Sequence, residues 1–234
     1  MSIIFCVITF LGFAGILIDG YFCLNLHDYR VMKLRLIIMA LAAMCLTLVV
    51  GCNEEDTVLT SQQEQIVRYL TSSHNPRLIA VEEVPNSMVA NPPFYERLNT
   101  STYRYIATYY DSGRNSKRQV AVGDEVELIF EAYEFTGSAP SLNTLYYTNN
   151  ADMIEKLAEN GLNSEFWSLE PLKVKIGSGD IIKGVEASLV DCREGDVVEV
   201  YMAFDAAYDK DVVGVIPAES SIMWVCQIKS VVKN

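Results

Sequence analysis

The side chains present after Cys52 limit the chemistry that this sequence can support. His74 is the only histidine in that part of the chain, and Cys192 and Cys226 are the only further cysteines. No CxxC or Cys/His spacing typical of a metal site occurs there. Tyr208 follows two alanines in a predicted loop, where core packing explains a tyrosine poorly. The sequence therefore predicts no metal and no bound cofactor, and it leaves aromatic, aliphatic and hydroxyl groups as the material for a site.

Cys192 and Cys226 both lie among apolar neighbours. Two cysteines do not make a disulfide framework, although a single bond can form in an oxidising compartment. We interpret them as two buried free thiols, and a disulfide between them is the alternative.

Two apolar segments, 2–18 and 34–50, have the composition of targeting signals rather than of a globular core. The second segment follows Met32 and two basic residues, and it ends in a glycine and Cys52. This order resembles a bacterial lipoprotein signal peptide over residues 32–51. The resemblance implies cleavage before Cys52 and lipidation of that cysteine. An ordinary signal peptide or a membrane anchor, in which Cys52 has no role, is the alternative.

Residues 1–31 need a separate explanation. We expect Met32 to be the true start of the chain, with residues 1–31 as an upstream extension. A first membrane helix is the alternative, because about 17 apolar residues is the lower limit for spanning a bilayer. Residues 52–60 are mostly polar and are predicted to be a linker.

The chain is acidic, with 30 acidic and 18 basic residues and a net charge of −12. Residues 1–51 carry three basic and two acidic side chains, so the part from Cys52 onward has a net charge of −13. Binding to nucleic acid needs basic patches, and so does electrostatic attachment to anionic lipid. The charge therefore argues against both partners.

The periodicity of apolar residues predicts the elements of the folded part. Alternation predicts strands over residues 102–110, 125–135, 172–176, 198–204 and 222–228. Helical spacing predicts one helix that starts at a capping box at 61–64, one over 151–160, and a short one that ends at 190. Strands dominate, so the predicted fold class is α+β, with a sheet packed on a single helix. Residues 61–115 are predicted to form a helical arm with the first strand.

Short motifs in the last half of the chain resemble the FKBP-type peptidyl-prolyl cis-trans isomerases. These motifs are VGDEV at 122–126, IGSGDIIKG at 176–184, REGD at 193–196, AY at 207–208 and GVIP at 214–217. Their order and spacing carry the resemblance, which covers residues 116–234. It implies a curved antiparallel sheet wrapped on one short helix, with an apolar pocket between them and with a helical insertion.

The resemblance also implies roles for individual residues. The backbone N–H of Ile182 and the hydroxyl of Tyr208 would hold the carbonyl of the substrate and act as the catalytic groups. Gly184 would let the chain turn into the short helix. The residues that would line the substrate pocket are Phe130, Tyr147, Leu172, Ile181, Val185, Val215, Ile216 and Trp224.

Several positions depart from the family pattern, and one of them is Asp209, which replaces the usual glycine after Tyr208. Val185 stands where the family usually has a tryptophan as the pocket floor, and Leu172 replaces an aromatic residue. The best match for the family's Phe-Asp pair is Tyr147-Thr148, which lacks the carboxylate.

The resemblance implies an isomerase without a cofactor that acts on proline-containing polypeptide clients. Together with the signal sequence, it implies a protein that is lipid-anchored to the outer membrane and assists protein folding in the cell envelope. The departures favour an alternative, a non-catalytic FKBP-like chaperone or binding lipoprotein. A third hypothesis is a surface lipoprotein for glycan or nutrient uptake, in which a tyrosine cluster stacks on sugars: Tyr103, Tyr105, Tyr109 and Tyr110.

Overall fold

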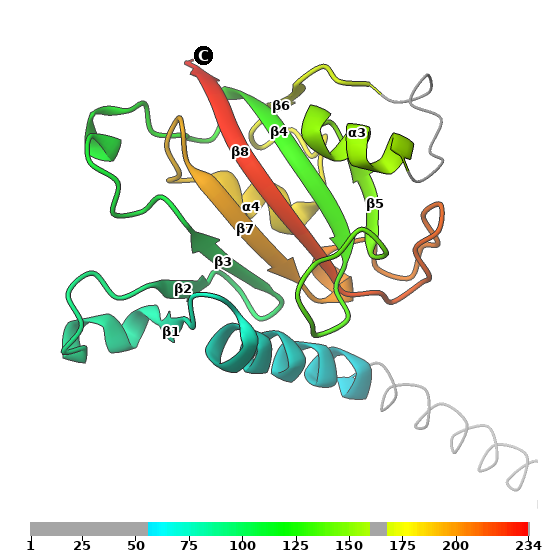
Figure 1. Cartoon of the computed structure of the whole chain (residues 1–234), viewed down its shortest axis with the longest axis horizontal. Helices are drawn as coiled ribbons and strands as arrows, with labels where there is room; N and C mark the ends of the chain where they lie inside the picture. The colour runs from blue at the N-terminus through cyan, green and yellow to red at the C-terminus, as the bar shows by residue number, and fades with distance from the viewer. Residues whose placement is uncertain (1–55, 160–167, 234) are drawn as a thin grey trace, which may run out of the picture. The chain divides into compact units, whose positions relative to one another are not determined.

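The structure is a computed structural model, and it describes residues 56–159 and 168–233 (Figure 1). The predicted signal peptide and the predicted lipidation site, Cys52, lie outside the described residues. Among the residues that are described, no helix is both long and apolar enough to cross a bilayer.

An eight-stranded sheet forms the centre of the fold (Figure 1). Its strands run in the order β1-β2-β3-β7-β8-β4-β5, and β6 pairs with β4 beside this path. All the pairs are antiparallel except β1 with β2. The bounds are β1 Ile79–Ala80, β2 Phe94–Arg97, β3 Thr102–Ile106, β4 Glu125–Glu134, β5 Leu145–Thr148, β6 Leu172–Lys175, β7 Val197–Met202 and β8 Ile222–Val232.

The helices are short apart from the one at the N-terminal side. Residues 56–68 are α-helical and continue into a π-helical turn, η1. The other bounds are η1 Tyr69–Ser73, η2 Val81–Asn86, η3 Arg114–Ser116, α3 Ala151–Glu159, α4 Lys183–Leu189 and η5 Phe204–Ala206. The structure confirms the predicted α+β class: a sheet packed on one short helix, α4, with a helical arm and a helical insertion, α3.

Several elements differ from their predicted bounds: β8 continues past residue 228 to Val232, and β7 ends at Met202 instead of residue 204. The N-terminal helix and β3 differ most clearly. The N-terminal helix already includes residues 56–60, which we expected in the linker, because Val58 and Leu59 are half-buried and extend its packed face. The strand predicted over 102–110 ends at Ile106. There the N–H of Tyr109 bonds back to the carbonyl of Ile106 at 3.2 Å and forms a turn.

The two faces of the sheet carry two separate cores, because successive side chains of a strand point to opposite faces. The first core contains the predicted inward faces of β4, β7 and β8, and α4 packs on it; its strand residues include Leu128, Phe130, Val200, Trp224 and Cys226. The second core joins the other face of the sheet to the N-terminal helix; it includes Ile66, Leu70, Tyr103, Tyr133 and Tyr201.

His74 lies at the edge of the second core and faces two hydrogen-bond acceptors. Its Nδ1 is 2.6 Å from the carbonyl of Pro76, and its Nε2 is 2.9 Å from the carboxylate of Glu199. Only the doubly protonated imidazolium can donate to both. Burial on its own lowers the pKa of His74, but the hydrogen bonds to Glu199 and Pro76 outweigh burial and raise it above its ordinary value.

We expect the fold to lose stability as the pH rises through the range in which His74 titrates. The pKa of His74 is higher in the folded state than in the unfolded state, so its protonation stabilises the fold. This stabilisation is complete below the ordinary pKa of 6.5 and is lost as the pH rises through the folded-state pKa. Urea unfolding across this range measures the loss, and Glu199→Gln should weaken the dependence. Stability that rises with pH in the wild type but not in Glu199→Gln would contradict this assignment.

Candidate functional site

The start of α4 presents a backbone donor beside an apolar surface. Ile182 is the residue before the helix, and its carbonyl accepts the N–H of Glu186 at 3.0 Å. Among residues 56–159 and 168–233, the N–H of Ile182 has no hydrogen-bond acceptor. The side chains of Ile181 and Ile182 are half-buried and pack on the first core. The N–H of Ile182 is therefore left without an acceptor beside this apolar surface, and it is the group that the resemblance assigns to the substrate carbonyl.

A carboxylate fixes the turn that leads into α4. The side chain of Glu186 accepts the N–H of Gly177 at 2.8 Å and the N–H of Gly179 at 3.1 Å. Both glycines have left-handed φ values, 90° and 78°, which other residues adopt only with strain. The first turn of the helix and the preceding loop are thus held together, and this sets the position of Ile181 and Ile182.

Gly184 has a different role from the one expected. It lies inside α4 and not at a left-handed turn, because its φ is not positive. A Cβ on Gly184 would stand 2.6 Å from the side chain of Met202 and 3.1 Å from the carbonyl oxygen of Ala206. The glycine lets α4 approach β7 and the segment that follows it.

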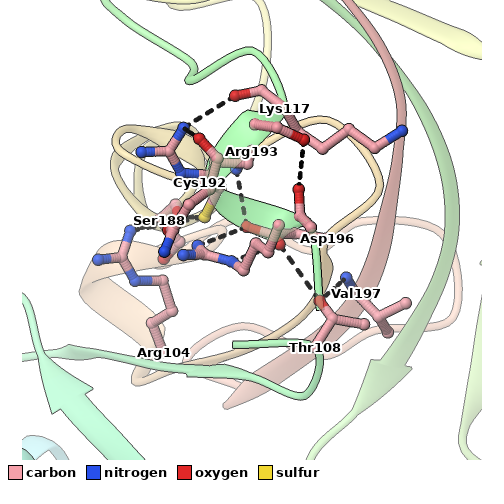
Figure 2. A network of polar contacts seen from close by, with 12 residues as sticks. Arg104, Thr108, Lys117, Ser188, Cys192, Arg193, Asp196 and Val197 are labelled. Atoms are coloured by element: carbon pink, nitrogen blue, oxygen red, sulfur yellow. Dashed lines mark hydrogen bonds and ion pairs between the residues drawn. The ribbon is translucent and has the colours of Figure 1, made fainter. Parts of the chain in front are cut away.

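Arg104 of β3 holds the other end of α4, as Figure 2 shows. Its Nη1 donates to the carbonyls of Ser188 at 2.9 Å and Val190 at 2.6 Å, and its Nε and Nη2 bind Glu96 at 2.7 and 2.6 Å. The last carbonyls of a helix lack partners within the helix, and a cation there is favourable. Arg104 therefore links the predicted arm to the helix of the site.

The two cysteines are buried and unpaired, which confirms the interpretation as free thiols. Cys192 donates to the carbonyl of Ser188 at 3.1 Å and lies beside Arg104. Burial raises the pKa of Cys192 to about 12. Burial also raises the pKa of Cys226, so neither thiol is a nucleophile at neutral pH.

Asp196 organises the loops beneath α4, and its contacts are drawn in Figure 2. Its carboxylate binds Nε and Nη2 of Arg114, each at 2.7 Å, and it also accepts the hydroxyl of Thr108 at 3.2 Å and the N–H of Arg193 at 2.7 Å. The hydrogen bond with Asp196 raises the pKa of Arg114. Asp196 is 1% exposed, so this is a buried ion pair with every oxygen satisfied.

Aromatic rings on β4, β5 and β8 form a wall on the α4 side of the sheet. Phe130 and Trp224 stack with ring centroids 4.5 Å apart and planes 10° apart. Tyr147 contacts Phe130 at 5.3 Å. The indole Nε1 of Trp224 donates to the hydroxyl of Tyr146 at 3.1 Å, and that hydroxyl lies 2.9 Å from the hydroxyl of Tyr208. Trp224, Tyr146 and Tyr208 thus form one hydrogen-bonded chain.

Tyr146 is the site residue that the sequence did not reveal. The pairing of β4 and β5 shifts between Ala132 and Tyr133, so that Tyr147 opposes Ala132 and Leu145 opposes Tyr133, with Tyr146 as the extra residue. Such a bulge re-aims side chains, and it lets the adjacent Tyr146 and Tyr147 both contact the aromatic wall. The adjacent tyrosines are visible in the sequence, but the bulge is not.

Both hydroxyls of this chain stay protonated at neutral pH. Burial raises the pKa of Tyr146 far above its usual range, and the neighbouring Tyr208 raises it further. Burial also raises the pKa of Tyr208. Since Tyr146 can donate to the oxygen of Tyr208, the proton of Tyr208 can be directed to an incoming carbonyl.

The comparison with protein families matches the part of the chain that holds most of these groups. Residues 153–229 match the model of the FKBP-type peptidyl-prolyl cis-trans isomerases. The chain carries an FKBP-type domain. The matched range contains Ile182, Tyr208 and Trp224. Phe130 and Tyr146, which complete the wall, precede it.

Comparisons with individual proteins add little to this assignment. A structure of the three FKBP domains of wheat FKBP73 is similar, with a TM-score of 0.43 and 14% identity. The match covers 58% of this chain and 48% of that chain, so this chain spans about half of its length. No curated protein matches.

The FKBP-type domain brings most of the predicted site residues together. Four are buried in the first core: Phe130, Val185, Ile216 and Trp224. Four more are half-buried against it: Leu172, Ile181, Ile182 and Tyr208. Tyr147 is 45% exposed but keeps its contact with Phe130. Val215 is 80% exposed and is not part of the core, because it lies at the tip of the loop where Val213 and Ile216 pair.

The position expected for an aspartate holds a structural group in this domain. Thr148 is buried, and its hydroxyl donates to the carbonyl of Phe130 at 2.6 Å and accepts the N–H of Asn150 at 3.0 Å. Thr148 therefore fastens β5 to β4, and it presents no carboxylate to the aromatic wall.

Proposed function

We propose that this chain catalyses the cis–trans isomerisation of X-Pro bonds in polypeptides. The observation that carries the proposal is the chain of hydroxyl and aromatic groups, Trp224–Tyr146–Tyr208, in a domain whose α4 start offers the unpaired N–H of Ile182. In this proposal a substrate's proline ring would pack against the side of the first core that holds Phe130 and Trp224, and its preceding carbonyl would accept hydrogen bonds from the two donors.

The reaction needs no nucleophile and no metal. Rotation about the peptide bond has a barrier of about 18–20 kcal/mol, because the C–N bond has partial double-bond character. A catalyst must bind the twisted amide more tightly than either planar form. The N–H of Ile182 and the hydroxyl of Tyr208 are donors held in place by surrounding structure, and a proline ring packed against Phe130 and Trp224, which are 2% and 5% exposed, would have little water on that side.

This chain lacks the tryptophan that the family usually carries on the helix, but it has a tryptophan on β8 instead. Val185 is fully buried in the first core, so it acts as core packing under the site. Trp224 supplies an indole from β8 instead, and it is fixed by stacking on Phe130 and by its bond to Tyr146. This supports an isomerase over a non-catalytic FKBP-like chaperone or binding lipoprotein.

Replacing Tyr208 by phenylalanine is expected to lower kcat/KM on X-Pro peptides about tenfold, the effect of losing one hydrogen bond in the transition state. Tyr146→Phe should give a smaller loss, because it acts on the substrate only through Tyr208. Tyr110→Phe is the matched control, since Tyr110 is 42% exposed and packs on Phe94 outside the first core. Protease-coupled peptide isomerisation measures all three. No acceleration by the wild type would leave the binding module as the function.

We further propose that the protein is lipid-anchored in a bacterial cell envelope and assists the folding of proteins there. The support is the order of residues 32–52, with its basic start, apolar stretch and terminal cysteine. Mass spectrometry of the mature N-terminus tests it: a chain that begins at a lipidated Cys52 is the expected result. In Cys52→Ala the lipid mass should be absent. An unmodified Cys52 in the wild type would contradict the anchor.

The proposal of sugar stacking finds no support in the tyrosine cluster. Tyr103 and Tyr105 are buried in the second core beneath the N-terminal helix, whereas Tyr109 and Tyr110 are partly exposed beside Phe94. The four tyrosines therefore do not share one surface.

A further inference from the structure

We propose that Gln62, on the N-terminal helix, is a positioning residue of the isomerase site. This inference rests on the proposed function, because Gln62 acts through the segment that carries Tyr208. The side-chain Nε2 of Gln62 donates to the carbonyl of Glu219 at 2.7 Å, and its Oε1 accepts the N–H of Phe204 at 2.9 Å. One amide group thus joins the two ends of the segment 204–219.

Backbone hydrogen bonds also join the two ends of the segment 204–219 through Asp209. The N–H of Asp209 bonds to the carbonyl of Phe204 at 2.8 Å, and the N–H of Glu219 bonds to the carbonyl of Asp209 at 2.9 Å. Asp209 and Glu219 both have a φ of 57°, in the left-handed region that is unfavourable for residues other than glycine. Surrounding contacts must hold such a conformation, and Gln62 supplies two of them.

Tyr208 lies inside this closed segment, next to the strained Asp209. Its hydroxyl reaches Tyr146 at 2.9 Å, while the same segment packs its backbone at Ala206 against Gly184 of α4. A shift at the ends of the segment therefore moves the Tyr208 hydroxyl relative to the N–H of Ile182. Small displacements of a catalytic group reduce the rate strongly.

The planar amide of Gln62 suits both contacts at once. It provides one donor and one acceptor, and the two backbone groups that it binds are an acceptor and a donor. A glutamate could still accept from Phe204, but it could not donate to the carbonyl of Glu219 at neutral pH. An alanine could do neither.

Gln65 offers a matched control on the same helix. Its Nε2 donates to the carbonyl of Thr136 at 3.0 Å, and its side chain packs on Gly137, where a Cβ would come within 2.4 Å. Gln65 therefore attaches the helix to the turn after β4 and makes no hydrogen bond to the segment 204–219. Removing the Gln65 side chain therefore tests the attachment of the helix to the fold without removing a hydrogen bond to the segment 204–219.

The experiment compares Gln62→Ala, Gln62→Glu and Gln65→Ala in the full chain, with kcat/KM on an X-Pro peptide and amide hydrogen exchange as readouts. We expect Gln62→Ala to lower kcat/KM about three- to tenfold, the size of one or two lost hydrogen bonds, and to speed exchange of the Phe204 amide. For Gln65→Ala we expect both kcat/KM and the exchange rate of the Phe204 amide to stay within about twofold of the wild-type values. Gln62→Glu should keep the Phe204 amide protected but still lower kcat/KM.

Wild-type kcat/KM in Gln62→Ala would overturn the proposal, and so would an equal loss in Gln65→Ala, which would indicate helix docking in general. A wild type without isomerase activity would distinguish the proposed function from the structural role of Gln62. The proposed function then fails, while faster exchange at Phe204 in Gln62→Ala alone would still support Gln62 as the group that positions the segment.

Discussion

Asp196→Ala is expected to lower the free energy of unfolding by about 3–5 kcal/mol, the cost of removing one partner from a buried ion pair. The carboxylate is 1% exposed and binds Arg114 through two bonds of 2.7 Å. Its loss leaves the Arg114 guanidinium, whose side chain is 10% exposed, without its counter-ion. It also removes the acceptor of Thr108 and of the Arg193 N–H. Urea unfolding followed by circular dichroism measures the change.

The control for this prediction is Asp111→Ala, which removes an exposed carboxylate from the loop before Arg114 and should change stability little. The double variant Asp196→Ala/Arg114→Met should recover part of the loss, because it no longer buries an unpaired charge. An Asp196→Ala variant as stable as Asp111→Ala would show that the pair does not hold the loops.

Trp224→Ala is expected to lower the free energy of unfolding by about 3–5 kcal/mol, the usual cost of truncating a buried tryptophan. Trp224 is 5% exposed, stacks on Phe130 and donates to Tyr146. We also expect a loss of kcat/KM of more than about tenfold, because the proline ring loses its aromatic wall and Tyr208 loses the support of a fixed Tyr146. Urea unfolding and the peptide isomerisation assay measure the two effects.

Trp224→Phe separates the ring from the hydrogen bond. It keeps an aromatic group against Phe130 but has no donor for Tyr146. We expect it to retain most of the stability and to show a kinetic loss similar to that of Tyr146→Phe. Wild-type kinetics in a folded Trp224→Ala protein would remove the aromatic wall from the mechanism.

The N-terminal arm is joined to the FKBP-type domain by backbone pairing and by side chains. β3 pairs with β7 along its whole length, from Thr102 with Met202 to Ile106 with Val198. Arg104 of β3 binds the end of α4, and Gln62 binds the segment after β7. The arm thus contacts both elements that carry the proposed catalytic groups, Ile182 and Tyr208.

Much of the fold was predictable because it follows from local patterns. The alternation along β4, β7 and β8 identifies the strands and the faces that meet α4, since side chains of a strand alternate between faces. The N-terminal helix ends at Ser73, just before Asn75-Pro76, because proline cannot continue a helix. The start of that helix was not predicted, because residues 56–60 are mostly polar in sequence and the packing of Val58 and Leu59 is visible only in the structure.

The candidate site was predicted only in part. The motifs located Ile181, Ile182 and Tyr208, and the resemblance assigned Trp224 to the same pocket; the structure places these residues around one core. The sequence missed Tyr146, because a bulge decides which of two adjacent tyrosines reaches Trp224. It also assigned Gly184 to a turn, whereas the glycine is needed for contact with Met202, a residue on another strand.

The sequence by itself determined the fold class, the inward faces of the main strands and the residue types at the site, because these depend on periodicity and on motifs of neighbouring residues. Only the tertiary structure decided how Arg104, Asp196 and Gln62 act, since the partners that define their roles, Ser188, Arg114 and Glu219, lie 84, 82 and 157 residues away along the chain. Hydrogen bonds over such separations form only after the sheet has brought the segments together, so no local pattern encodes them.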